Sequence, residues 1–221
     1  GVGSNNWAVS GKRTASGNPI LSNDPHLELN LPSIWYIMHL ISPSQNVMGV
    51  TIPGAPGIIG GFNDYISWGF TNGYDDVMDW YDIHFRDKRQ NEYYHDNQWK
   101  PTWKIVEEIK IRNSESFYDT VTYTHHGPVV WDYPDQTFSL GKRGLHNSIR
   151  QTSSGRALRW LTHDKSNEMR SFYLLNKGKN YDDFVHALEF FTCPGQNIIY
   201  ADINGNISIW HAGNTPAKWK R

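Results

Sequence analysis

The chain has 221 residues, of which 38% are apolar and 14% aromatic, including 10 Trp and 12 Tyr. This composition excludes a disordered chain and predicts a packed core, and the many aromatic residues favour β structure. The net charge of −1 and the lack of a basic patch argue against a nucleic-acid partner, and no apolar run is long enough to span a membrane. The single cysteine, Cys193, excludes an intramolecular disulfide framework and a cysteine-based zinc site.

The first two thirds of the chain alternate between short β-type runs and turn signals. Two hairpins are expected near the start, and a third is predicted to turn at Asp96-Asn97. The predicted strands cover residues 7–10, 19–22, 34–42, 46–54, 65–71, 77–85, 91–101, 102–112, 119–131, 136–143 and 156–164.

The pattern changes to helical spacing over residues 167–178 and 180–191. Asn180 is a predicted N-cap for the second helix, since Asp182 and Asp183 follow in its first turn. Residues 197–213 predict a closing hairpin that turns at Asn204-Gly205. With no repeat or linker, residues 1–221 are predicted to form a single α+β domain that is mainly antiparallel β.

Four stretches together resemble the penicillin acylase (penicillin amidase) family of N-terminal-nucleophile hydrolases. They are "GSNNWAVSGKRTASGNPILSNDPHL" (3–27), "GFNDYISWGFTNGYDDVMDWY" (61–81), "RWLTHD" (159–164) and "NIIYADINGNISIWHAG" (197–213). The resemblance covers nearly all of the chain and corresponds to the N-terminal part of the family's β chain. It implies that the chain is part of a four-layered αββα sandwich, and that Gly1–Gly3 are a residual spacer before a mature start at Ser4.

Ser4 is the candidate nucleophile. A serine hydroxyl needs a base at pH 7, and an α-amine, with a pKa of roughly 7.7–8.0, can provide one. The resemblance implies that self-cleavage of the Gly3–Ser4 bond frees this amine, and the glycine before Ser4 suits that step. While residues 1–3 remain attached, the amine is held in a peptide bond and the mechanism cannot run. The alternative is that Ser4 simply begins a strand.

His26 and Asn72 are assigned catalytic roles by the same resemblance. His26 is expected beside Ser4, where it orients the hydroxyl or the amine; otherwise it satisfies backbone groups in a proline turn. Asn72 is expected to contribute its backbone N–H to the oxyanion hole. The family's second oxyanion donor is an asparagine side chain further along the β chain, and no stretch here carries it.

The resemblance also predicts a structural calcium site at Asp76, Asp79 and the carbonyl of Met78. Carboxylate and carbonyl oxygens suit Ca²⁺, but further ligands are expected from the α chain and from beyond residue 221, so the site is incomplete in this chain. The alternative is a solvated acidic turn. Asp202 and Asn204–Asn206 are expected to shape the closing hairpin rather than to act in catalysis.

Five residues are implied to surround the acyl group of the substrate: Pro25, Leu27, Ile59, Phe70 and Trp160. Apolar walls suit an aromatic or aliphatic acyl group. Core packing is the alternative for each, and for Trp160 it is the default interpretation.

The predicted function is amide hydrolysis of the penicillin amidase type, acting on β-lactams or other N-acyl compounds. The alternatives are an acyl-homoserine-lactone acylase of the same family and a non-catalytic, β-rich carbohydrate-binding module that uses its Trp and Tyr. The expected partners are the α chain of the same precursor and the remainder of the β chain, and the expected location is the bacterial periplasm or outside the cell. The chain opens on Gly-Val-Gly without Met, and is predicted to be a processed or excised piece that is inactive alone.

Overall fold

The computed structural model describes residues 3–131 and 153–218. They gather into two compact units, which we call unit 1 (Gly1–Val77 with Asp164–Arg221) and unit 2 (Met78–His163). Each unit is described by itself below. The single domain expected over residues 1–221 stays a prediction.

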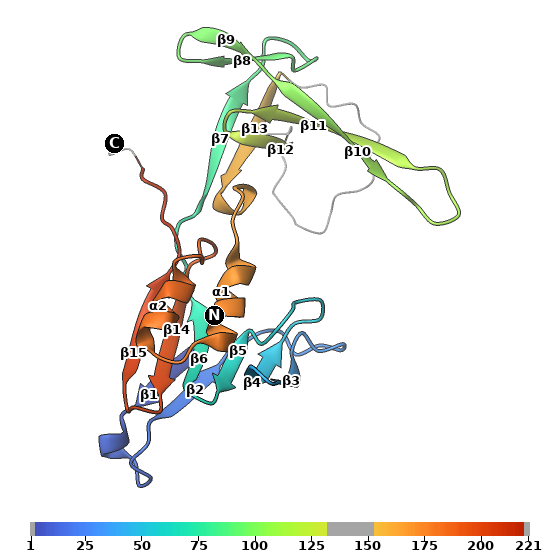
Figure 1. Ribbon diagram of the computed structural model, residues 1–221. Helices are drawn as coiled ribbons and strands as arrows, with labels where there is room; N and C mark the ends of the chain where they lie inside the picture. Colours follow the sequence, from blue (N-terminus) through green and yellow to red (C-terminus); the bar gives the residue numbers. More distant parts are fainter. Residues whose placement is uncertain (1–2, 132–152, 219–221) are drawn as a thin grey trace. The chain divides into compact units, whose positions relative to one another are not determined.

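Unit 1 is built on a six-stranded antiparallel sheet in the order β15-β14-β6-β5-β4-β3 (Figure 1). A separate antiparallel hairpin, β1 (Asn5–Val9) and β2 (Ile20–Asp24), precedes it in the chain. The strands of the six-stranded sheet are β3 (Tyr36–Ser42), β4 (Gln45–Thr51), β5 (Gly60–Asn63), β6 (Ile66–Asn72), β14 (Gln196–Asp202) and β15 (Ile207–Ala212).

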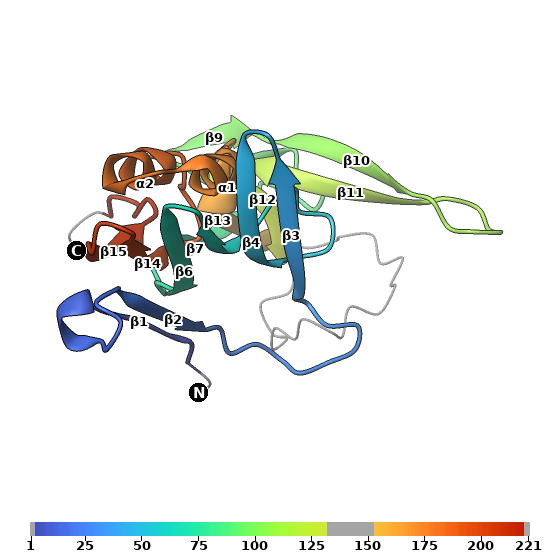
Figure 2. The same cartoon turned by 60° about the horizontal axis from the view of Figure 1, so that its bottom comes forward.

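Two helices, α1 (Glu168–Lys177) and α2 (Tyr181–Leu188), cover one face of this sheet, and the β1–β2 hairpin lies against the other face (Figure 2). Residues of β6 alternate between the two layers, as the period of a strand requires. Trp68 belongs to the core beneath the helices, whereas a Cβ on Gly69 would lie 2.6 Å from the Cβ of Asn23 in the hairpin. Unit 1 therefore has a helical layer followed by two β layers.

The core of unit 1 is formed by apolar residues from the helices and from the central strands. Phe184 of α2 packs on Tyr200 of β14 with ring centroids 4.7 Å apart. The buried core consists of Val47, Ile58, Ile66, Trp68, Leu175, Phe184, Ala187, Leu188, Phe191, Ile198, Tyr200 and Ala212.

Helix α2 begins where its sequence predicts. The side chain of Asn180 accepts a hydrogen bond from the Asp183 amide at 2.9 Å, and the Asp183 carboxylate accepts one from the Lys179 amide at 2.9 Å. The Asn180 cap satisfies an amide that the first turn leaves without a helical partner, and the bond from Lys179 holds the residue just before the cap. No described helix has the length and apolar character needed to cross a membrane.

Unit 2 contains a five-stranded antiparallel sheet in the order β10-β11-β12-β13-β7 and a small hairpin, β8–β9. Its core is formed by Ile83, Phe85, Tyr93, Val129 and Ala157. The strands are β7 (Met78–His84), β8 (Glu92–His95), β9 (Gln98–Pro101), β10 (Trp103–Ile109), β11 (Phe117–Thr124), β12 (Gly127–Trp131) and β13 (Ser154–Trp160).

The predicted fold class, α+β and mainly antiparallel β, is confirmed, since every strand pair between the described strands is antiparallel. The turn at Asp96-Asn97 is also confirmed, with positive φ values of 50° and 60° at its two residues. The run 119–131 differs from the prediction, because a turn at His125–His126 splits it into β11 and β12. The strand predicted over residues 136–143 lies outside the described residues.

Candidate active site

The β1–β2 hairpin brings Ser4 and His26 together. Asn5 pairs with Asp24 in the antiparallel register, so the residues just outside the two strand ends lie opposite each other. The backbone N–H of His26 donates a hydrogen bond to Ser4 Oγ at 3.0 Å. The pairing expected from the sequence is therefore present, but it is the main chain of His26 that holds the hydroxyl.

The imidazole of His26 points to two other groups. Its Nδ1 contacts the carbonyl oxygen of Gly3, and its Nε2 lies 3.0 Å from a carboxylate oxygen of Asp24. The carbonyl of the Gly3–Ser4 peptide bond is thus in contact with an ionisable side chain that a neighbouring carboxylate orients.

A largely apolar pocket of about 320 Å³ opens beside Ser4 within unit 1. Its size lies in the range of small-molecule sites. Six residues singled out from the sequence line it: Ser4, Pro25, Leu27, Ile59, Phe70 and Asn72. The structure therefore brings the candidate nucleophile, the candidate oxyanion residue and four of the five candidate acyl contacts to one cavity.

The fifth candidate acyl contact, Trp160, belongs to unit 2, where it ends β13 and packs edge-to-face on His163 with centroids 5.8 Å apart. The residue is 37% exposed, so among the described residues it is not part of the buried core, where the default interpretation places it. Its contact with the acyl group stays a prediction.

Several lining residues were not identified from the sequence. Glu168, Phe172 and Leu175 lie on one face of α1, and their spacing of four and three residues is a signal that could have found them. Trp68 could also have been found from the sequence, because successive residues of β6 point alternately to the two layers of unit 1. The other lining residues come from loops and from distant strands: Ile34, Trp35, Ile52, Thr71, Phe191, Cys193, Pro194, Gln196 and Ile198.

Asn72 ends β6 and is held from the neighbouring strand β14. Its side-chain oxygen accepts a hydrogen bond from Gln196 Nε2 at 3.0 Å, and its backbone carbonyl accepts one from Asn197 Nδ2 at 3.4 Å. These contacts hold the side chain and the carbonyl of the residue whose backbone N–H is the candidate oxyanion donor.

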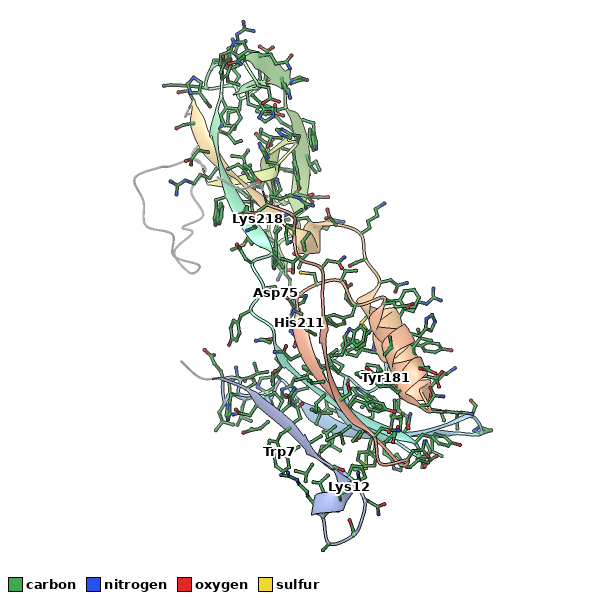
Figure 3. The ribbon with its side chains drawn as sticks, turned by 90° about the vertical axis from the view of Figure 1, so that its left-hand side faces the viewer. Trp7, Lys12, Asp75, Tyr181, His211 and Lys218 are labelled. Atoms are coloured by element: carbon green, nitrogen blue, oxygen red, sulfur yellow. The ribbon has the colours of Figure 1, made fainter. Side chains whose placement is uncertain are left out.

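A polar chain behind Asn72 supports Asn197. The Asn197 side-chain oxygen lies 2.9 Å from His211 Nδ1, and His211 Nε2 lies 2.9 Å from the nearer carboxylate oxygen of Asp75. Figure 3 shows Asp75 and His211 close to each other in unit 1. Asp75 fits tightly there, because a Cβ on Gly195 would lie 1.6 Å from Asp75 Oδ2.

Glu168 joins the start of α1 to the segment that follows α2. It accepts hydrogen bonds from Ser166 Oγ at 2.6 Å, from the amides of Thr192 and Cys193 at 3.3 Å each, and from the Thr192 hydroxyl. Burial alone would raise the pKa of Glu168, but the hydrogen bonds from Ser166 and Thr192 outweigh it and hold this pKa below the ordinary glutamate value.

Cys193 lines the same pocket as Ser4. Burial, together with the nearby carboxylates of Glu168 and Asp75, raises the pKa of its thiol. The thiolate is the nucleophilic form of cysteine. At neutral pH the thiol therefore stays protonated, and it does not compete with Ser4, the candidate nucleophile, in this pocket.

The expected calcium ligands are divided between the two units. Asp76 belongs to unit 1, where its carboxylate pairs with Lys218, and Met78 and Asp79 begin β7 in unit 2. Their oxygens are of the hard type that Ca²⁺ prefers, and they make up three of the roughly six to eight ligands it takes. The donor chemistry fits the ion, and the ligand set stays a prediction.

Asp202 and its neighbours have the structural role expected of them. The Asp202 carboxylate accepts hydrogen bonds from the amides of Asn204 and Asn206 at 2.9 Å each and from Tyr200 Oη at 2.8 Å. Gly205 has a φ of +92°, as this turn requires.

Several known proteins resemble this chain. A family model described as penicillin amidase matches residues 2–221. An acyl-homoserine lactone acylase, QuiP, of Pseudomonas aeruginosa is 30% identical over 90% of this chain and 23% of its own length. The penicillin acylase 2 proenzyme of Pseudomonas sp. (strain SE83) is 31% identical over 66% of this chain and 19% of its own length.

Penicillin G acylase of Escherichia coli is 26% identical over 96% of this chain and 23% of its own length. Among solved structures, a thermostable penicillin G acylase from Alcaligenes faecalis superposes with a TM-score of 0.74 at 24% identity, covering 94% of this chain and 35% of that chain. The chain thus shares the fold of that enzyme and spans about a quarter of the length of the curated relatives.

Proposed function

Because the chain belongs to the penicillin amidase family, we propose that it carries the nucleophile and acyl pocket of an enzyme that hydrolyses linear amides of N-acyl compounds. The observation that supports this most strongly is the position of Ser4. Its hydroxyl is held by the His26 amide at 3.0 Å and lines an apolar pocket together with Asn72.

The proposed reaction begins once the Gly3–Ser4 bond is hydrolysed and the α-amine of Ser4 is free. Ser4 Oγ attacks the carbonyl carbon of the substrate amide, and the α-amine takes the hydroxyl proton. The oxygen of the tetrahedral intermediate carries the negative charge, which the Asn72 N–H stabilises. The intermediate collapses, the amine product leaves with the proton, and an acyl ester on Ser4 remains. Water then attacks this ester, releasing the acid and restoring the hydroxyl.

The substrate class is suggested by the pocket walls. Phe70, Phe172, Leu27 and Ile59 present apolar surface near Ser4, which favours an aromatic or aliphatic acyl group over a charged one. Penicillins and other N-acyl compounds fit this description. Acyl-homoserine lactones are the second candidate, supported by the 30% identity to the enzyme of that name over 90% of the chain.

The rest of the protein is expected to complete the site. We propose that the α chain and the remainder of the β chain supply the second oxyanion donor and further calcium ligands. On this basis the 221-residue chain alone should show little or no amide turnover. The family resemblance also supports a periplasmic or secreted location.

The proposal is tested on the full-length protein. N-terminal sequencing should show a chain that begins at Ser4, and a sulfonyl fluoride should label Ser4 and abolish hydrolysis of phenylacetyl and long-chain acyl amides. Ser4→Ala should remain uncleaved and inactive, whereas Ser10→Ala, a hydroxyl outside the pocket, should be processed and active. Unimpaired hydrolysis by Ser4→Ala would overturn the proposal.

A further inference from the structure

Three histidines from two separate segments of unit 2 meet at one point. His95 ends β8, and His125 and His126 form the turn between β11 and β12. Each offers a ring nitrogen within 4.8 Å of those of the other two. Among the residues described, this is the one group of three metal-ligating side chains arranged so closely.

The turn that presents two of these histidines is fixed by its surroundings. Thr124 pairs with Gly127 across the turn, and the His126 amide donates to Thr124 Oγ1 at 3.2 Å. Gly127 has a φ of +125°, and a Cβ there would lie 2.2 Å from the Leu158 carbonyl oxygen. The turn therefore packs against β13, and this contact fixes the backbone that carries the two rings before any ligand binds.

The surroundings of two of the three rings, those of His125 and His126, disfavour protonation. Burial lowers the pKa of His126 to about 4, with further lowering by His125 and His95. Burial also lowers the pKa of His125, as do His95 and Lys100, against an opposing effect of Asp96. Neutral imidazole is the form that binds metal ions.

Groups outside the cluster orient its members. The hydroxyl of Tyr93, a buried core residue, lies 2.6 Å from His125 Nδ1, which leaves Nε2 of that ring available. The Asp96 carboxylate lies 3.1 Å from His95 Nε2, and His126 stacks on Tyr81 with centroids 3.8 Å apart. A carboxylate hydrogen-bonded to the second nitrogen of a ligating histidine is typical of metal sites, and the Tyr93 hydroxyl occupies the equivalent place at His125.

We propose that His95, His125 and His126 bind one divalent transition-metal ion of the zinc type, with water at the remaining position. Nitrogens bound at 2.0–2.1 Å to a tetrahedral ion lie roughly 3.4 Å apart, so small side-chain rotations close the site. Three imidazoles select Zn²⁺, Co²⁺, Ni²⁺ or Cu²⁺ over Ca²⁺ and Mg²⁺. The ion would join the β8–β9 hairpin to the β11–β12 turn and stabilise unit 2.

The test uses tag-free, full-length protein and Co²⁺ as a spectroscopic probe. One equivalent of Co²⁺ should give the intense visible absorption of a tetrahedral nitrogen site, and one equivalent of Zn²⁺ should remove it. His126→Asn should weaken binding at least tenfold. The matched control His186→Asn, an exposed histidine of α2 in unit 1, should bind as the wild type does.

Tyr93→Phe keeps the core side chain and removes the hydroxyl that faces His125. It should weaken Co²⁺ binding about 10–100-fold, the usual cost of losing such a partner, while circular dichroism remains that of the wild type. Two results would overturn the proposal and leave the cluster as an aromatic packing contact. The first is that the wild type takes up no more Co²⁺ than the triple variant His95→Asn/His125→Asn/His126→Asn. The second is that His186→Asn reduces binding as much as His126→Asn does.

Discussion

The amide nitrogen of His26 lies 3.0 Å from the hydroxyl oxygen of Ser4 and donates a hydrogen bond to it. The imidazole of the same residue faces the Gly3 carbonyl and the Asp24 carboxylate instead. The two parts of His26 therefore serve different steps in the proposed scheme: the main chain positions the nucleophile, and the side chain contacts the bond to be cut.

His26→Ala should separate these two roles. The amide that holds Ser4 Oγ remains, so kcat of the processed full-length enzyme should fall by no more than about tenfold, the value of one hydrogen bond. Cleavage of the Gly3–Ser4 bond should slow, and uncleaved precursor should accumulate on gels. His39→Ala, which alters a histidine on β3, should be processed at the wild-type rate. Normal processing of His26→Ala would show that the imidazole contact with Gly3 has no part in the cleavage.

Asn176 should stabilise the loop that places Ile59 in the pocket wall. Its buried side chain accepts from the Ile58 amide at 2.8 Å and donates to the Ile58 carbonyl at 2.6 Å. Asn176→Ala leaves both backbone groups without their partner, so the free energy of unfolding should fall by about 2–3 kcal/mol. Urea denaturation measures this, with the exposed Asn18→Ala as the control, which should change stability by less than about 0.5 kcal/mol. Equal effects of the two changes would contradict the assigned role.

Glu168 should make stability depend on pH. Its pKa is lower in the folded protein than in the unfolded chain, because hydrogen bonds from Ser166 and Thr192 outweigh burial. The stabilisation is therefore fully present above the ordinary glutamate pKa of about 4.3 and is lost as the pH falls through the folded-state pKa. Urea midpoints of the wild type and Glu168→Gln should differ at pH 7 and converge in acid. A difference that stays constant down to pH 3 would count against this explanation.

Gly195 and Asp75 should be energetically coupled. The Cβ of Gly195→Ala would lie 1.6 Å from Asp75 Oδ2, so this change should displace the carboxylate and cost several kcal/mol. Asp75→Ala removes the obstructing atoms, and the double variant should therefore lose less stability than the two single losses added together. A double-mutant cycle by denaturation measures the coupling. Simple additivity would mean that the clash is relieved elsewhere.

Calcium and the proposed transition metal should respond to different chelators. EGTA should lower the thermal midpoint of the full-length protein if Asp76, Asp79 and the Met78 carbonyl bind Ca²⁺, and Asp79→Asn should remove this sensitivity. A nitrogen chelator such as 1,10-phenanthroline, used with excess Ca²⁺ present, should act only on the histidine cluster. If the thermal midpoint is the same with and without EGTA, the predicted calcium site is contradicted.

The local parts of the fold were predictable from the sequence. The cap of α2 at Asn180 and the turns at Asp96-Asn97 and Asn204-Gly205 depend on residues within a few positions of each other. Three of the acyl-contact candidates that line the pocket, Pro25, Leu27 and Phe70, lie in stretches that resemble the family, and Ile59 lies just ahead of one of these stretches. The short strand β5, with its two glycines, has no periodic signal of its own and was missed.

The residues that sequence reasoning missed depend on distant contacts. Asn176 meets Ile58 across 118 positions of the chain, and Gln196 meets Asn72 across 124. The turn at His125–His126 was hidden because β-type residues continue on both sides of it. No periodicity within one segment indicates which histidine of another segment will lie beside it, so the cluster with His95 required the structure.

The β1–β2 hairpin that follows Ser4 has one further consequence. Its strand pairing starts at Asn5 and Asp24, and it is fastened to the main sheet by the Asn23 amide, which exchanges two hydrogen bonds with the backbone of Phe70, and by Asn6 Nδ2 on the Asn197 carbonyl. All of these attachments lie downstream of residue 4. Severing the polypeptide just ahead of β1, as the proposed cleavage of the Gly3–Ser4 bond would do, therefore leaves the anchorage of the new chain end intact, so the hairpin stays folded on the sheet.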